Sequence, residues 1–272
     1  VLAMPELPEV EVVRATLDRH LAGLIIKDID CFYEPIIENL SFFKEKVVNQ
    51  KIIEIKRYAK YLIFILSNGA FLSHLRMEGK YFYVEEDYEI QKHQHVVFHL
   101  NNGYKLIYQD VRKFGRIEYK SIEDLYSTYP LSELGPEANQ KEYNLDELYL
   151  KLKRKMLPIK TVLLDQKFIS GLGNIYVDEV LYAAHISPLR RASRIKKTEL
   201  ETILISSQAI LNDAIKKKGT TIRSYTSSLG VIGNYQNFLM VHTKKECPHC
   251  NRGLSIIKIG GRTSYYCKAC QR

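Results

Sequence analysis

The sequence predicts a multidomain α+β protein, in which an N-terminal antiparallel β-sandwich with flanking helices precedes a helical domain and a small C-terminal metal-binding hairpin. Short segments rich in β-branched and aromatic residues occupy the first half of the chain, and longer segments with helical periodicity occupy the second. Four of the five cysteines crowd into the last segment. A chain of 272 residues is long enough to bury more than one core.

The N-terminal domain is expected over residues 1–134. The apolar residues Val10, Val13, Leu17 and Leu21 recur at helical spacing, and Pro8 stands where a first helical turn tolerates proline. A helix is therefore predicted over residues 8–20. Segments such as "KYLIFIL", "HVVFHL" and "YKLIYQDV" follow, separated by turn signals such as "SNGA" and "NNGY". They predict an antiparallel sandwich.

A domain boundary is expected near "SELGPEANQ", where Gly135 and Pro136 interrupt the pattern. A helical domain is predicted over residues 135–234 and a cysteine-bearing domain over 235–272. "NLDELYLKLKRK" offers Asn144 as a helix cap, and "GNIYVDEVLYAAHI" and "KTELETILISSQAILNDAIKKKG" both carry helical periodicity.

The last four cysteines form two CxxC pairs separated by sixteen residues, with a segment between them that can form a hairpin. The proposed ligands are Cys247, Cys250, Cys267 and Cys270. Four thiolates at this spacing suit one structural Zn²⁺ ion in a closed tetrahedral site. The alternatives are redox cysteines, which two symmetric pairs disfavour, and an iron–sulfur cluster, which a cytosolic ribbon of this form disfavours. Cys31 stands alone and is interpreted as a small buried hydrophobe.

The chain carries 40 Lys and Arg against 31 Asp and Glu, with a pI of about 9.1. This balance favours a polyanionic partner, although a solvated basic surface is the plain alternative. There is no apolar run long enough to cross a bilayer and no secretory signal pattern. We therefore expect a soluble cytoplasmic protein without a membrane partner, and a monomer, because no segment is typical of an oligomerisation element.

One set of motifs decides the functional prediction: "MPELPEVE", "HLRMEGKY", "DVRKFG" and "GLGNIYVDE", together with Lys60 in "RYAKYLIF" and Arg262 in "GGRTSYYC". In this order the motifs resemble the bacterial formamidopyrimidine-DNA glycosylases, from Met4 to Arg272. The resemblance implies a two-sheet domain, a helix–two-turn–helix domain and a zinc finger. It also implies excision of oxidised purines such as 8-oxoguanine from duplex DNA, followed by strand cleavage through β,δ-elimination.

The resemblance assigns catalytic roles to five residues. Pro5 is the nucleophile, because a free N-terminal secondary amine can attack the sugar C1′ and hold it as an iminium. A generic α-amino group titrates about 2.5 units below lysine, which leaves more of it neutral at pH 7. The resemblance makes Glu6 the acid that protonates the opening sugar, and Glu9 a supporting carboxylate. Lys60 is a proton donor in β-elimination, and Arg262 grips phosphate for the second elimination. Taken alone, Lys60 and Arg262 would be read as solvated surface charges.

A base inside a duplex must be extruded before it can be excised, and the vacancy must be filled. In the resembling motifs Met77, Arg112 and Phe114 match the filling residues, although ordinary core packing is the alternative for Met77 and Phe114. Further residues match DNA-contacting positions: His74, His93, Lys155, Lys160 and Asn174. The stretch "TTIRSYTSSLGVIGNYQ" matches the loop that closes over the flipped base, and Arg223 and Tyr225 are its proposed lesion-contacting residues.

The sequence departs from the family pattern in three places. "VHTKKEC" lacks the tyrosine–glycine–basic run usual before the first zinc cysteine, and "IKTVLL" lacks a usual proline and aromatic residue. Both departures affect expected DNA contacts near Lys160 and His242. If "VLAM" stays attached, the nitrogen of Pro5 is an amide and cannot attack. We therefore expect translation to start at Met4 and the methionine to be removed.

Two other functions remain compatible with the sequence. A sister enzyme of the same fold would act on oxidised pyrimidines, but the "HLRMEGKY" and "DVRKFG" motifs favour purines. A non-catalytic, zinc-dependent DNA-binding protein would use the basic surface and the cysteine hairpin without the N-terminal amine.

Overall fold

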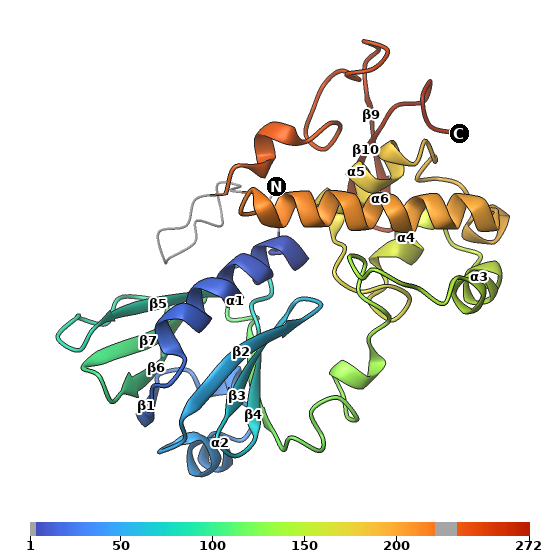
Figure 1. Ribbon diagram of the computed structural model, residues 1–272. Coiled ribbons are helices and arrows are strands. Elements are labelled where there is room, and N and C mark those ends of the chain that lie inside the picture. Colours follow the sequence, from blue (N-terminus) through green and yellow to red (C-terminus); the bar gives the residue numbers. More distant parts are fainter. Residues whose placement is uncertain (1–3, 221–232) are drawn as a thin grey trace. The chain divides into compact units, whose positions relative to one another are not determined.

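The computed structural model describes residues 4–220 and 233–272 (Figure 1). These residues form two compact units. The sheet unit contains Glu9–Ser132 together with residues 4 and 5, and the helical unit contains Glu133–Thr220, Gly233–Arg272 and the short segment Glu6–Pro8. The proposed lesion-contacting residues Arg223 and Tyr225 lie outside the described residues.

The sheet unit contains two four-stranded antiparallel sheets, as the sandwich prediction required. One sheet has the strand order β1-β6-β7-β5 and the other the order β2-β3-β4-β8. The strands are β1 Ile26–Cys31, β2 Ile52–Tyr58, β3 Tyr61–Leu66, β4 Ala70–His74, β5 Lys80–Glu85, β6 Gln94–Leu100, β7 Tyr104–Gln109 and β8 Arg116–Lys120. Helices α1 (Leu7–Leu21) and α2 (Leu40–Val47) flank them (Figure 1).

Aromatic rings and the apolar face of α1 build the core of the sheet unit. Phe64 of β3 lies opposite Phe71 of β4, and their rings stack with centroids 4.2 Å apart. Phe71 in turn stacks at 5.5 Å on Phe98, which belongs to the other sheet. The same core includes the four residues of the predicted helical stripe, Val10, Val13, Leu17 and Leu21. The predicted helix over residues 8–20 is thus confirmed as part of α1.

The helical unit is organised around helix α5 (Asn174–Ala183), whose residues from Ile175 to Tyr182 are all buried. The other elements are α3 Leu145–Lys153, α4 Ile159–Leu164, α6 Lys197–Lys216, and the hairpin strands β9 Ser255–Ile259 and β10 Arg262–Tyr266. Helices α4 and α6 and strand β10 all pack against α5 (Figure 1). Asn144 caps α3 as predicted, since its Oδ1 accepts the Glu147 N–H at 3.1 Å.

Among residues 4–220 and 233–272, no helix combines the length and the apolar character that a membrane span requires.

Candidate active site and nucleic-acid interface

Two turns of the sheet unit carry the residues predicted to fill the vacancy in DNA. Arg112 and Phe114 are both exposed on the turn between β7 and β8, and the Arg112 guanidinium lies over the Phe114 ring, 4.8 Å from its centroid. Met77 is half-buried on the turn between β4 and β5. A ring that is 48% exposed does not belong to the core, so the structure disfavours the packing interpretation of Phe114.

Asp110 shapes the first of these turns. Its carboxylate is fully buried and accepts the Arg112 N–H at 3.0 Å and the Gly115 N–H at 2.7 Å. Gly115 is required at its position, because a Cβ atom there would lie 1.7 Å from the Tyr108 hydroxyl. The backbone is therefore fixed on both sides of Arg112 and Phe114, and only their side chains remain free to reach a ligand.

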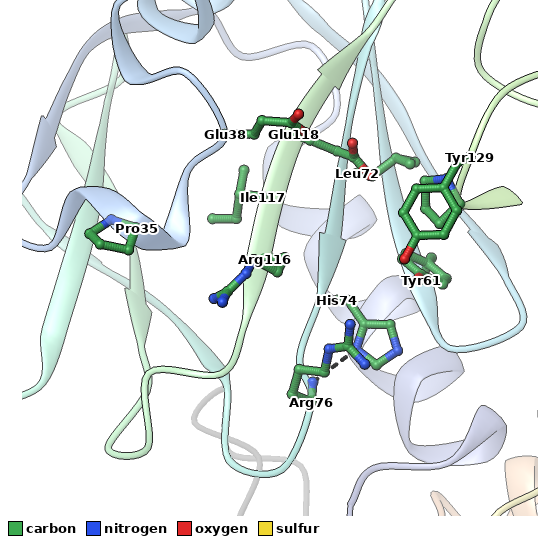
Figure 2. A pocket seen from close by; sticks show the side chains of 11 residues that line it. Pro35, Glu38, Tyr61, Leu72, His74, Arg76, Arg116, Ile117, Glu118 and Tyr129 are labelled. Atoms are coloured by element: carbon green, nitrogen blue, oxygen red, sulfur yellow. Dashed lines mark hydrogen bonds between the residues drawn. The ribbon is translucent and has the colours of Figure 1, made fainter.

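His74 lies at the end of β4 and lines a cavity of about 370 Å³ within the sheet unit (Figure 2). Its Nδ1 accepts the Arg76 N–H at 3.0 Å, which places the proton of the neutral ring on Nε2. Burial lowers the pKa of His74 to about 3, and the positive charges of Arg76 and Lys60 act in the same direction. His74 is therefore a neutral hydrogen-bonding group at physiological pH.

The same cavity separates charges of opposite sign. Glu38 and Glu118 lie together at one end, His74 and Arg76 lie at the other, and Arg116 lies between them (Figure 2). Burial raises the pKa of Glu118, and its hydrogen bond with Glu38 adds to the effect. The basic end of the cavity is the end that carries the proposed DNA-contacting histidine.

The other predicted residues of the sheet unit lie on separate elements. Lys60 follows Ala59 in the turn that joins β2 to β3 and is buried, and Glu9 is buried in the first turn of α1. His93 is half-buried, and its carbonyl oxygen accepts the Asp110 N–H at 3.0 Å. His93 therefore borders the turn that presents Arg112.

In the helical unit, Glu6 occupies the N-terminus of α5. Its carboxylate accepts the N–H groups of Gly173 at 2.6 Å, Ile175 at 2.8 Å and Tyr176 at 3.3 Å, and only 2% of the residue is exposed. The free N–H groups and the dipole at a helix N-terminus stabilise a negative charge. A Cβ atom at residue 173 would lie 2.4 Å from the Glu6 carboxyl carbon, so the glycine of "GLGN" makes room for this carboxylate.

Asn174, Lys160 and Arg262 gather around the same end of α5. The Asn174 Nδ2 donates to the Thr263 carbonyl oxygen at 2.9 Å, and Arg262 is exposed at the start of β10. Lys160 is fully buried, and its ammonium donates to Asp178 at 2.7 Å and to Thr263 O at 3.2 Å. The structure therefore uses the Lys160 ammonium inside the protein, whereas its expected role was contact with DNA.

Lys155 lies before α4 with 41% of its side chain exposed, and its ammonium lies 3.5 Å from a carboxylate oxygen of Asp165. This weak ion pair leaves the lysine at the surface of the helical unit, where a phosphate can reach it.

The four C-terminal cysteines form a cluster that suits a metal ion. Their sulfur atoms all lie within 4.8 Å of one another. The sulfurs of Cys247 and Cys270 are 3.8 Å apart, and those of Cys250 and Cys267 are 3.5 Å apart. Zinc–sulfur bonds of about 2.3 Å in a tetrahedron require sulfurs about 3.8 Å apart, so the spacing fits. Strands β9 and β10 form the predicted hairpin between the two pairs.

Three buried carboxylates had no predicted role from the sequence. Asp110 shapes a turn, Asp178 binds Lys160, and Glu179 accepts the backbone N–H groups of three consecutive residues, 240–242. Asp178 and Glu179 stand in "NIYVDEVLY", where both neighbours of the acidic pair are apolar. The three residues on each side of the pair, 175–177 and 180–182, are all apolar or aromatic, so this helix is apolar on every face and is expected to be buried together with its two charges.

Two family models match this chain. The model of the formamidopyrimidine-DNA glycosylase N-terminal domain covers residues 4–117, and the model of the formamidopyrimidine-DNA glycosylase H2TH domain covers residues 134–226. Curated formamidopyrimidine-DNA glycosylases from Oceanobacillus iheyensis and Streptococcus pneumoniae R6 are 42% and 41% identical to it, over 98% and 99% of each chain.

Solved structures agree with this result. The complex of Lactococcus lactis Fpg with DNA containing an abasic site matches with a TM-score of 0.93 and 36% identity, over 98% of this chain and all of the other. The complex of the wild-type enzyme with DNA containing N7-benzyl-Fapy-dG gives a TM-score of 0.92.

A two-sheet unit with exposed cationic turns, a helical unit of the H2TH type and a hairpin closed by four cysteines define the class of H2TH DNA glycosylases. Within that class the matches leave no ambiguity, because they extend over nearly the whole length of this chain and of its relatives. The chain belongs to the formamidopyrimidine-DNA glycosylase family, an assignment in which the motifs, the fold and the comparisons agree.

Proposed function

We propose that this enzyme excises oxidised purines, 8-oxoguanine and formamidopyrimidines, from duplex DNA and then cleaves the strand at the resulting abasic site. The observation that carries the proposal is the position of Glu6. A carboxylate fixed by three backbone N–H groups stands directly after Pro5, the residue whose amine is the nucleophile in the family. A fixed carboxylate one residue away can transfer the protons that amine attack and sugar opening require.

The amine of processed Pro5 attacks C1′ of the damaged nucleotide, and its N–H proton passes to the Glu6 carboxylate. The glycosidic bond breaks, and the base leaves and takes a proton from water. As the sugar ring opens, its O4′ takes a proton from Glu6, and the Pro5 nitrogen and C1′ become an iminium ion. The iminium acidifies the C2′–H bond, and loss of that proton to the Glu6 carboxylate, ionised again, breaks the bond to the 3′-phosphate. Loss of the C4′ proton in the same way then breaks the bond to the 5′-phosphate. Lys60 donates a proton in the first elimination, with Glu9 in support, and Arg262 assists the second.

The remaining predicted residues bind the DNA around the lesion. Met77, Arg112 and Phe114 fill the vacancy left by the extruded nucleotide. His74, His93, Lys155 and Asn174 contact phosphates, which neutral side-chain donors and cationic groups both bind. We extend the proposal to the domain limits 1–134, 135–234 and 235–272, to a monomeric state and to a cytoplasmic location where chromosomal DNA is the partner.

We also propose that Cys247, Cys250, Cys267 and Cys270 hold one structural Zn²⁺ ion. Four sulfur ligands and no open position are typical of a structural rather than a catalytic zinc site. The ion would fix the hairpin that presents Arg262, a segment too short to fold around a core of its own.

Borohydride trapping tests the proposed reaction. Protein that begins at Pro5 is mixed with a duplex containing 8-oxoguanine opposite cytosine, and sodium borohydride reduces any iminium to a stable adduct. We expect a protein–DNA adduct and a product cleaved on both sides of the lost nucleoside. The matched control is the same chain with Val1–Met4 retained, which has an amide nitrogen at Pro5 and should bind the duplex without forming an adduct.

The lesion separates the remaining alternatives. Faster processing of thymine glycol than of 8-oxoguanine would assign the enzyme to oxidised pyrimidines. Specific binding with no adduct from protein beginning at Pro5 would leave only the DNA-binding function and refute the proline mechanism.

A further inference from the structure

A buried cluster of three ionisable side chains lies beneath the cysteine hairpin, within the helical unit. Lys160 of α4 binds Asp178 Oδ1 at 2.7 Å, and His242 Nδ1 lies 2.9 Å from Asp178 Oδ2. The side chains of Lys160 and Asp178 are 0% exposed, and that of His242 is 4% exposed. Taking charges out of water is expensive, and removal of one member of such a cluster leaves its partners buried without compensation.

Strand β10 contacts this cluster along the edge that faces away from β9. In an antiparallel pair, the backbone N–H and C=O groups of successive residues point alternately toward and away from the partner strand. Those of Thr263 and Tyr265 point away from β9. Lys160 and Asn174 both donate to the Thr263 carbonyl oxygen, and the Tyr265 N–H lies 3.3 Å from Asp178 Oδ2. An edge strand normally leaves such groups to water. Here side chains of α4 and α5 replace the missing neighbouring strand.

Arg262 immediately precedes the segment Thr263–Tyr265, whose backbone binds the cluster. It follows the two-residue turn Gly260–Gly261, whose φ angles of +55° and +76° suit a tight hairpin turn. The guanidinium itself is exposed, while the backbone on its C-terminal side is fixed at Thr263 and Tyr265. The backbone that presents Arg262 is therefore held by Lys160 and Asp178, both of which are buried.

We propose that Asp178 and His242 are positioning residues for the second elimination: Asp178, held by Lys160 and His242, fixes the outer edge of β10 and thereby the aim of Arg262 at phosphate. The inference rests on the proposed function, in which Arg262 assists that step. His242 lies in "VHTKKEC", the segment where this chain departs from the usual tyrosine–glycine–basic run.

A purely structural role for the cluster makes a different prediction. If the cluster only stabilised the hairpin, its loss would reduce every step of the reaction together, including DNA binding. If it aims Arg262, the step that uses Arg262 declines alone, because the carboxylate of Glu6 is held by the N–H groups at the start of α5 and not by Asp178 or His242.

Asp178→Asn tests the distinction with little change of shape. On duplex DNA containing 8-oxoguanine, we expect the rate of borohydride trapping to stay within about twofold of wild type, while the ratio of doubly to singly eliminated product falls at least fivefold. Arg262→Ala should give the same ratio, and the double variant should fall no further, as expected when both residues act through one interaction. An unchanged ratio, or an equal fall in trapping and in ratio, would overturn the proposal.

A pair of variants at His242 keeps the test decisive if Asp178→Asn fails to fold. His242→Asn keeps a side-chain N–H that can reach Asp178, and His242→Phe keeps the ring packing against Tyr265 but loses the donor. We expect His242→Asn to keep the wild-type ratio of doubly to singly eliminated product. We expect His242→Phe to lower this ratio although its zinc content equals that of wild type. Equal ratios in the two variants would refute the proposal. Absence of trapping in the wild type would instead refute the proposed function, whereas the product ratio of the variants tests only the positioning role.

Discussion

The sheet unit and the helical unit hold their functional side chains by different means. In the sheet unit, Arg112 and Phe114 are exposed on a turn that one buried carboxylate shapes through backbone N–H groups. In the helical unit, Glu6 and Lys160 are themselves buried, and both are held by groups on or beside α5. The first arrangement fixes a backbone and leaves the side chains free, whereas the second fixes the charged groups themselves.

The difference shows which substitutions should remain local. An exposed side chain on a fixed turn can change without disturbing its neighbours, because its backbone contacts belong to other residues. A member of a buried charge network cannot, because its removal leaves a partner charge or dipole unsatisfied. Loss of a member of the buried network should therefore disturb the groups that it contacts, such as the edge of β10, whereas a change of an exposed side chain on the turn of the sheet unit should not.

Removal of the metal should have the largest effect. Cys267→Ser, or chelation with EDTA, should release the zinc ion and unfold the β9–β10 hairpin, because the hairpin has too little core to fold without metal. Hydrogen exchange of the Arg262–Tyr266 amides should accelerate to the rate of unfolded peptide, while the strands of the sheet unit keep their protection. Cys31→Ser is the matched control, and zinc content should be unchanged there.

Lys160→Met should break the charge network from the other side. The Asp178 carboxylate would lose its buried cationic partner, and such losses typically cost about 3–5 kcal/mol of stability. Urea unfolding measures the change. The double variant Lys160→Met with Asp178→Asn should recover part of the loss, since it removes the unpaired charge. A single variant as stable as wild type would show that Asp178 does not need this partner.

Gly115→Ala should be a local defect of the sheet unit. The new methyl would lie 1.7 Å from the Tyr108 hydroxyl and 2.7 Å from its Cζ atom, and overpacking of this kind typically costs about 1–3 kcal/mol. Tyr108→Phe should recover part of the cost, because it removes the nearer atom. Gly253→Ala, where no atom lies within 4 Å, is the control and should change stability by less than about 0.5 kcal/mol.

His74 should make the sheet unit sensitive to acid. The pKa of His74 is lowered from its ordinary value of 6.5 to about 3 in the folded protein. Below about pH 6.5, His74 is therefore protonated in the unfolded chain but stays neutral in the folded protein. Stability therefore falls as pH falls, by about 1.3 kcal/mol between pH 7 and 5.5 from this group. Urea unfolding at both values measures the slope, and His74→Phe should remove that share of it. An equal slope in the variant would mean that His74 titrates normally.

Much of the fold was readable from the sequence because its signals are local. The stripe Val10, Val13, Leu17 and Leu21 predicted a helix, turn signals such as "SNGA" predicted hairpins, and the spacing of the cysteines predicted their cluster. Each of these depends on residues within a few turns or strands of one another. The family motifs then supplied the order of the domains.

The buried charges could not be predicted in the same way, because their partners are distant in the sequence. Lys160 pairs with Asp178, which in turn meets His242, 64 positions further along the chain. No local pattern encodes such a meeting. Lys160 in "KLKRKMLPIK" is indistinguishable from the exposed lysines before it until the fold places it against α5.

The contact between Glu6 and the start of α5 has a consequence for how the protein is made. Glu6 leaves the ribosome early, but its partner Gly173 lies 167 positions later, a delay of about 8–33 s at ordinary rates of synthesis. During that interval nothing from α5 can hold the N-terminal segment, so a peptidase that removed Met4 would have open access. Once α5 emerges, its N–H groups bind the Glu6 carboxylate, and the adjacent residue Pro5 is then tethered to a folded helix. The order of synthesis thus allows processing to precede assembly of the active site.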